Sequence, residues 1–148
     1  MVASWQVGKH VIIMKLRWSR SWGRSVQPRK QRKFIFNAPN HIKRKLLASP
    51  LSKGLRKEHK KRSLVVRKGD TVKILRGQFK TIMGKITEIN VKKTRIFVDG
   101  AHQVKANGQI APYPIHPSNL VIITPILSDK KRKEALARKW VNKDTFQD

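Results

Sequence analysis

The chain has 148 residues, and its 35 Lys and Arg residues outnumber its 8 Asp and Glu residues, for a formal net charge of +27. Because a compact protein with so much charge of one sign repels itself, we expect a polyanionic partner, with nucleic acid favoured over an anionic membrane. The chain has no cysteine, which excludes disulfides, thiolate zinc sites and a cysteine nucleophile. Its aliphatic runs are far shorter than the ~20 residues that a membrane-spanning helix needs.

The N-terminal segment, residues 1–36, contains no acidic residue. Apolar residues recur in it every three or four positions, at Val7, Val11, Met14, Trp18 and Trp22. That spacing predicts one face of a helix, and on an Arg-rich, acid-free segment it is typical of a mitochondrial transit peptide. The alternative is that translation begins at Met14, so that residues 1–13 are an extension.

Residues 24–62 are a basic arm with fourteen Lys or Arg and one acidic residue, Glu58. Asn40 is a candidate N-cap for a short helix that runs to Leu47. Ser49 with Pro50 after it predicts the start of a second short helix. Because almost no acids are interspersed, we expect phosphates rather than neighbouring side chains to neutralise the arm.

Residues 63–124 read as β-structure, because apolar and polar residues alternate between turn signals. Asn107-Gly108 predicts a hairpin flanked by Val104 and Ile110. The apolar spacing in 86–91 slips by one residue, which predicts a β-bulge. The candidate strands are 64–66, 71–76, 84–91, 95–98 and 120–124.

A basic loop joins the second and third of these strands. Gly77 and Gly84 stand at its two edges, where a missing Cβ permits positive φ or the close approach of another chain. Lys80 lies between them, and Arg76 and Lys85 flank them. This composition suits a phosphate backbone better than a small substrate.

The last predicted element is a helix that begins at Ser128 or Asp129. Ala135, Leu136 and Trp140 would form its apolar side. The basic cluster 130–133 in its first turn opposes the helix dipole, which indicates a nearby anion. A frayed basic tail is the alternative.

The strand–loop–strand segment resembles the KOW motif, an RNA-binding signature inside a small SH3-like barrel. The motif usually has glycine after its loop lysine, and this chain has Thr81 there. The residues that carry the resemblance are Gly69-Asp70, Val72, Ile74, Gly77, Lys80, Gly84-Lys85 and Ile86.

The flanking segments are similar to the archaeal and eukaryotic branch of one ribosomal family, the universal KOW-containing protein of the large subunit. The similarity extends from about residue 14 to 139, and family members typically start as at Met14-Lys15, which favours the reading of 1–13 as an extension. Its most specific segments are 36–45, 49–53, 66–70, 104–108 and 115–122. The resemblance implies binding to large-subunit rRNA near its 5′ end early in assembly, beside the peptide exit tunnel and neighbouring ribosomal proteins. It also implies a cytoplasmic ribosome, with nucleolar assembly if the source is eukaryotic.

The expected fold is mainly β, an SH3-like barrel with a long basic N-terminal arm of short helices and a C-terminal helix. We divide the chain into a possible extension (1–13), an rRNA-binding arm (14–62), the barrel (63–124) and a C-terminal helix and tail (125–148). The residues expected to contact RNA are Arg29, Lys30, Arg32, Lys33, Asn37, His41, Lys43, Arg44, Lys45, Lys53, Arg67, Lys68, Arg76, Gly77, Lys80, Gly84, Lys85, Lys92, Lys93, Lys105, His116 and Ser118.

No enzyme, cofactor, metal or small-molecule substrate is expected, because the eight carboxylates are scattered and the five histidines lack metal-ligand spacing. Asp70 has a structural use, capping the turn into the strand at Thr71. Two other binding modules compete with the ribosomal reading. A KOW domain of an elongation factor would need a partner domain and acidic contacts, and a linker-histone-like DNA binder would lack the β-rich middle.

Overall fold

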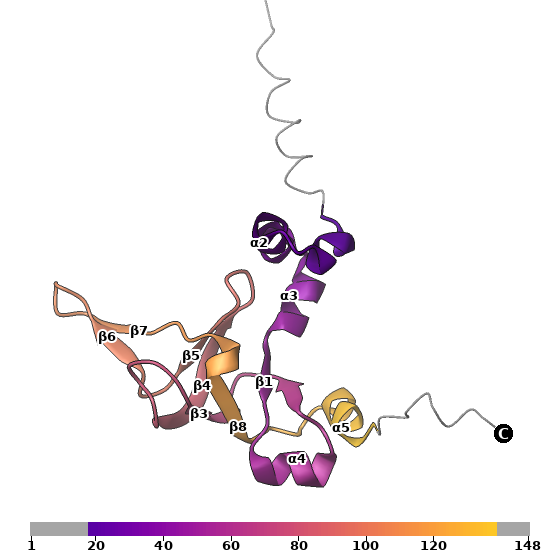
Figure 1. The fold of residues 1–148 in the computed structure, drawn as a ribbon. Coiled ribbons are helices and arrows are strands. Elements are labelled where there is room, and N and C mark those ends of the chain that lie inside the picture. Colours follow the sequence, from indigo (N-terminus) through magenta and orange to yellow (C-terminus); the bar gives the residue numbers. More distant parts are fainter. Residues whose placement is uncertain (1–17, 139–148) are drawn as a thin grey trace, which may run out of the picture. The chain divides into compact units, whose positions relative to one another are not determined.

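The computed structural model describes residues 18–138, and the chain divides into two compact units between Lys43 and Arg44 (Figure 1). Helix α3 (Asn40–Leu46) spans the division. In residues 18–138 no helix is long and apolar enough to cross a bilayer. Of the predicted N-terminal helical face, Val7, Val11 and Met14 lie outside the described residues.

The first unit contains a 3₁₀ turn, η1 (Arg20–Arg24), and helix α2 (Pro28–Asn37). The Trp18 indole Nε1 donates a 3.0 Å hydrogen bond to the Phe34 carbonyl, and the two rings lie 5.2 Å apart. The sequence reading missed α2, although Pro28 at its first turn is a start signal. Its only apolar run is 34–36, too short to show a helical period.

The second unit is built on antiparallel strands (Figure 1). Its main sheet has the order β5-β4-β3-β8, with β3 (Thr71–Ile74), β4 (Met83–Asn90), β5 (Arg95–Val98) and β8 (Leu120–Thr124). Two smaller sheets pair β1 (Ala48–Pro50) with β2 (Ser63–Val65) and β6 (His102–Val104) with β7 (Ile110–Pro112). The register of β4 on β5 shifts between Ile86 and Glu88, so the predicted bulge is confirmed.

The alternating strand residues form the core of this unit. Val72, Ile74, Ile96, Val98, Leu120 and Ile122 are all nearly inaccessible to solvent. Leu51 joins them through a parallel bridge to Ile122. The predicted strands are therefore confirmed, the first and third displaced by one residue and the second ending at Ile74.

The Asn107-Gly108 hairpin is confirmed, with Val104 opposite Ile110. Its turn is longer than the two residues predicted. The Lys105 amide donates to the Gln109 carbonyl, so the turn consists of the three residues 106–108. Gly108 has φ 78°, as expected for a three-residue turn with glycine at its left-handed position.

The predicted helix start at Ser49 and Pro50 is wrong. Both residues lie in β1, where Ser49 is fully buried and its Oγ donates to the Pro117 carbonyl at 2.7 Å. The helix α4 (Lys53–His59) begins later, with Ser52 as its N-cap accepting from the Leu55 amide. Strand pairing of β1 with β2 overrides the local Ser-Pro signal.

Helix α5 (Lys130–Ala137) is capped by Asp129, one of the two predicted caps, and it buries Leu136 as predicted. Trp140 lies outside the described residues. Arg132 was predicted as part of an anion-binding cluster, but it is buried and forms a two-pronged ion pair with Asp70, at 2.6 and 2.9 Å. Asp70 does cap its turn, because Oδ2 accepts from the Arg67 amide.

The described chain thus mixes α and β structure, with antiparallel sheets and four α-helices in residues 18–138. The predicted antiparallel core, basic helical arm and C-terminal helix are present. The helices occupy a larger share than a mainly β fold implies, because α2 was not expected.

Candidate nucleic-acid interface

The predicted RNA-contacting residues are almost all on the surface. Every one of them is exposed except Asn37, Lys43 and Gly84, which are half-buried. In the first unit, four exposed basic residues lie on α2, at Arg29, Lys30, Arg32 and Lys33. Residues 18–43 contain no carboxylate, so nothing within them offsets this charge.

Three of the predicted residues in the first unit have internal contacts, and the first is Arg29, whose Nε donates to the Gln27 side-chain oxygen at 3.4 Å. The Lys33 ammonium lies 4.6 Å from the centre of the Trp22 ring, a cation–π contact. The Lys43 ammonium donates to the Phe36 carbonyl at 3.0 Å. His41 is exposed near the start of α3.

The basic loop between β3 and β4 is closed by backbone hydrogen bonds. The Ile74 amide donates to the Ile82 carbonyl, and the Thr81 amide donates back to Ile74, both at 2.9 Å. Gly77 has φ 98° at the first edge, as the glycine predicted. Thr81, which replaces the usual glycine, has φ 79°, a left-handed conformation that is strained for a β-branched residue. The loop therefore holds Lys80 at an exposed position on a defined backbone.

Gly84 does not take positive φ, unlike Gly77. A Cβ built on it would lie 2.3 Å from the Asp99 carbonyl oxygen and 3.0 Å from a Val98 methyl. The close approach that its glycine allows is thus to the chain's own β5 segment. Lys85, the next residue, is exposed on β4 opposite Thr71.

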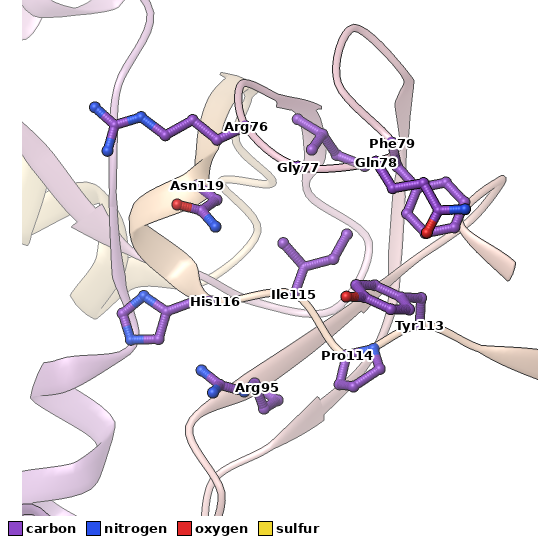
Figure 2. Close-up of a pocket in the computed structure, with 11 residues that line it drawn as sticks. Arg76, Gly77, Gln78, Phe79, Arg95, Tyr113, Pro114, Ile115, His116 and Asn119 are labelled. Carbon is purple, nitrogen blue, oxygen red and sulfur yellow. The ribbon is translucent and has the colours of Figure 1, made fainter. Parts of the chain in front are cut away.

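One hollow of about 200 Å³ brings predicted residues together (Figure 2). Arg76, Gly77 and His116 line it, although 40 positions separate the first and last. Ile74 and Ile115, both buried, are among its apolar lining residues. In Figure 2 the aromatic residues Phe79 and Tyr113 stand on one side of Ile115, and Asn119 and His116 stand on the other.

His116 is held by the turn that follows it. Its Nδ1 caps the 3₁₀ turn η2 (Pro117–Asn119) by accepting from the Ser118 amide at 3.3 Å. The same nitrogen lies 2.8 Å from the Ser118 hydroxyl. Burial, and then the nearby Arg95 guanidinium, lower the pKa of His116 below its usual 6.5. With Nδ1 accepting and the ring neutral, Nε2 carries the proton and can donate.

A second, larger hollow of about 750 Å³ lies beside α5. It brings together the predicted residues Arg44, Arg67 and Lys68 with Lys131. Arg67 is already paired with Asp129 at 3.2 Å, so part of the charge here is neutralised internally.

The remaining predicted residues are dispersed over the second unit. Lys53 begins α4, Lys92 and Lys93 lie in the turn after β4, and Lys105 begins the turn of the β6–β7 hairpin. Lys45 lies in α3. None of these five residues lines either hollow.

Sequence reasoning missed the polar and aromatic lining residues Gln78, Phe79, Arg95, Tyr113 and Asn119 of the smaller hollow. Phe79 lies inside the predicted loop, and Tyr113 is the chain's one tyrosine, between two prolines. Their ring centres are 5.1 Å apart, a pairing across 34 positions that no local pattern reveals.

One comparison with known proteins bears on this surface. The family model for the ribosomal proteins called L26 in eukaryotes and L24 in archaea matches residues 25–139, more than half of the chain. The match covers α2, the basic loop, both hollows and α5. The chain therefore belongs to this family of large-subunit ribosomal proteins, whose role is structural rather than enzymatic and implies association with rRNA.

Proposed function

We propose that the chain holds large-subunit rRNA through phosphate contacts made by exposed basic residues of both units. The observation that carries this proposal is the lack of internal counter-charge: 35 basic residues face 8 acidic ones. Of those few acids, Asp70 and Asp129 are already engaged by arginines. Most of the exposed Lys and Arg therefore have no carboxylate to pair with, and phosphates suit them.

The finer statements come from the family resemblance. They are a closed SH3-like barrel over 63–124, an rRNA-binding arm over 14–62 and contact with the 5′ region of the rRNA. They also include entry early in assembly, a place near the exit tunnel beside other ribosomal proteins, and residence in cytoplasmic ribosomes. The wide scatter of basic residues supports such a role, because a protein that contacts several rRNA segments needs cations on several faces.

The loop between Gly77 and Gly84 would supply one fixed contact. Its backbone is closed by internal hydrogen bonds, so Lys80 and Lys85 meet the RNA without first ordering the loop. The helical arm would bind along the RNA backbone, since α2 presents four exposed basic residues within five positions.

The test is a double charge reversal, Lys80→Glu with Lys85→Glu, measured by filter binding to a transcript of the 5′ region of large-subunit rRNA. We expect weaker binding and a log–log salt slope that is less steep by about 1.4–1.8, because two phosphate contacts are lost. The matched control is Lys57→Glu with Arg138→Glu, which makes the same change in net charge at exposed residues outside the predicted RNA-contacting residues and outside the basic cluster 130–133.

Equal loss of affinity in both double variants would show that only net charge matters and would contradict the loop contact. Co-sedimentation of the unaltered chain with large ribosomal subunits in moderate salt would separate the ribosomal role from an elongation factor or a DNA-binding protein.

A further inference from the structure

We propose that the smaller hollow binds one unpaired nucleotide of the rRNA, with its base against Tyr113 and Ile115 and its phosphate at Arg76 or Arg95. This inference rests on the proposed function and specifies the ligand of one site. It adds a base-binding subsite to the phosphate contacts proposed above.

The surface of the hollow is suited to a flat, partly apolar group. The half-buried rings of Phe79 and Tyr113 give it an accessible apolar surface, and Ile74 and Ile115, only 1% and 4% exposed, line it as well. Tyr113 packs against Phe79 at 5.1 Å and Pro114 follows it, so the tyrosine ring is held in place. Proteins recognise single-stranded RNA by stacking its unpaired bases on aromatic rings, and Tyr113 offers such a ring.

The polar groups of the hollow suit the edge of a base. Gln78 and Asn119 carry amides, each of which can donate and accept hydrogen bonds. His116 adds a neutral Nε2–H donor, since its Nδ1 is occupied by Ser118. A bare phosphate would use neither these groups nor the apolar surface.

Two arginines line the same hollow, Arg76 and Arg95. Neither side chain has a carboxylate or hydrogen-bond partner within residues 18–138. Arginine binds phosphate oxygens in a two-pronged geometry and also stacks on bases. An apolar peptide side chain would leave both cations unused, so the combined chemistry selects a nucleotide.

The size of the hollow selects one base rather than a duplex. Its volume of about 200 Å³ is below the ~300–1,000 Å³ of sites for drug-sized ligands. Paired bases hide their edges, so the nucleotide must come from a bulge, loop or strand end.

The chain's single tyrosine makes the site directly observable. Biosynthetic fluorotyrosine places one fluorine label in the full-length chain, at Tyr113, and its ¹⁹F resonance is followed by NMR. We expect nucleoside monophosphates and a short single-stranded RNA to shift this resonance. Ribose 5-phosphate and inorganic phosphate serve as probes without a base, and they should leave it near its free position.

A binding assay complements the label. Tyr113→Leu should weaken binding to the rRNA transcript by about 5- to 150-fold, the range for loss of one stacked base, with an unchanged salt slope. Lys93→Leu is the matched control, because it removes an exposed predicted phosphate contact that does not line the hollow and should make the slope less steep. Far-UV circular dichroism checks that both variants fold.

The outcomes are distinguishable. If the transcript binds with the expected salt dependence but leaves the ¹⁹F resonance unmoved, the nucleotide site is refuted and the proposed function stands. If ribose 5-phosphate shifts the resonance as far as the nucleotides do, the hollow binds the phosphate alone and the base-binding assignment is refuted. If the transcript does not bind at all, the proposed function fails together with the inference.

Discussion

Replacing Arg132 by methionine tests the contact that holds α5 on the β core. Asp70 is fully buried, and its carboxylate accepts from two backbone amides, those of Arg67 at 2.8 Å and Ile126 at 2.9 Å. Arg132, 8% exposed, adds two further hydrogen bonds and the balancing charge. The Arg132 guanidinium also donates to the carbonyls of Val65 and Ile126.

Removing one partner of a buried ion pair costs about 3–5 kcal/mol, because the other charge stays buried without its counter-ion. We expect the Arg132→Met variant to lose about 3 kcal/mol of unfolding free energy, at the lower end of that range. Helix α5 can detach and admit water to Asp70. The loss of unfolding free energy therefore cannot exceed the free energy that holds α5 against the β core. Detachment would expose Leu136, whose burial is worth about 1.5–3 kcal/mol.

The assay is urea unfolding of the full chain, followed by far-UV circular dichroism, as a double-mutant cycle with Asp70→Asn. The double variant should be less destabilised than the sum of the two single variants, because neither charge is then left alone. Lys133→Met removes an exposed charge from the same helix and should stay within about 0.5 kcal/mol of the unaltered chain. An Arg132→Met variant as stable as Lys133→Met, or strictly additive effects of the pair, would refute the reasoning.

Three further predictions concern the basic loop and the hollow beside it. Thr81→Gly should stabilise the chain by about 0.5–1 kcal/mol in urea unfolding, because glycine adopts the left-handed conformation without the strain that threonine has there. This gain exceeds the extra conformational entropy that glycine loses on folding, and a loss of stability would contradict the prediction. Gly84→Ala should destabilise it by about 1–3 kcal/mol, because its Cβ would meet the Asp99 carbonyl, whereas Gly54→Ala, with nothing within 4 Å, should stabilise α4 by about 0.5–1 kcal/mol. Since the pKa of His116 is lower in the folded chain than in the unfolded one, the unfolded state binds more protons below about pH 6.5; stability should fall as the pH drops through that range, and His116→Gln should reduce the fall.

The predictions that depended only on residues close together in the sequence were the most successful. The segments 95–98 and 120–124 were predicted to the residue, because short runs rich in β-branched and aromatic residues between turn signals are typical of strands. The loop glycine Gly77 was predicted for its positive φ, and the bulge near Glu88 for a slip in spacing. The family, too, was recognisable from short ordered segments.

Two of the wrong predictions share one cause, a partner far away in the chain. Ser49 reads locally as a helix cap, but its hydroxyl bonds to Pro117, 68 positions away. Arg132 reads as part of a cationic cluster, but it pairs with Asp70, 62 positions away. A local pattern contains no information on which distant group will meet a given side chain.

The sequence by itself therefore determined the charge, the partner class, the family and most strand positions, because each is a local or additive property of the residues. Only the tertiary structure decided which cations remain available and where a hollow forms. The nucleotide site combines Arg76, Phe79, Arg95, Tyr113 and His116, which packing brings together from three separate segments. Such a site comes into being only when the strands pair and the core closes beneath it.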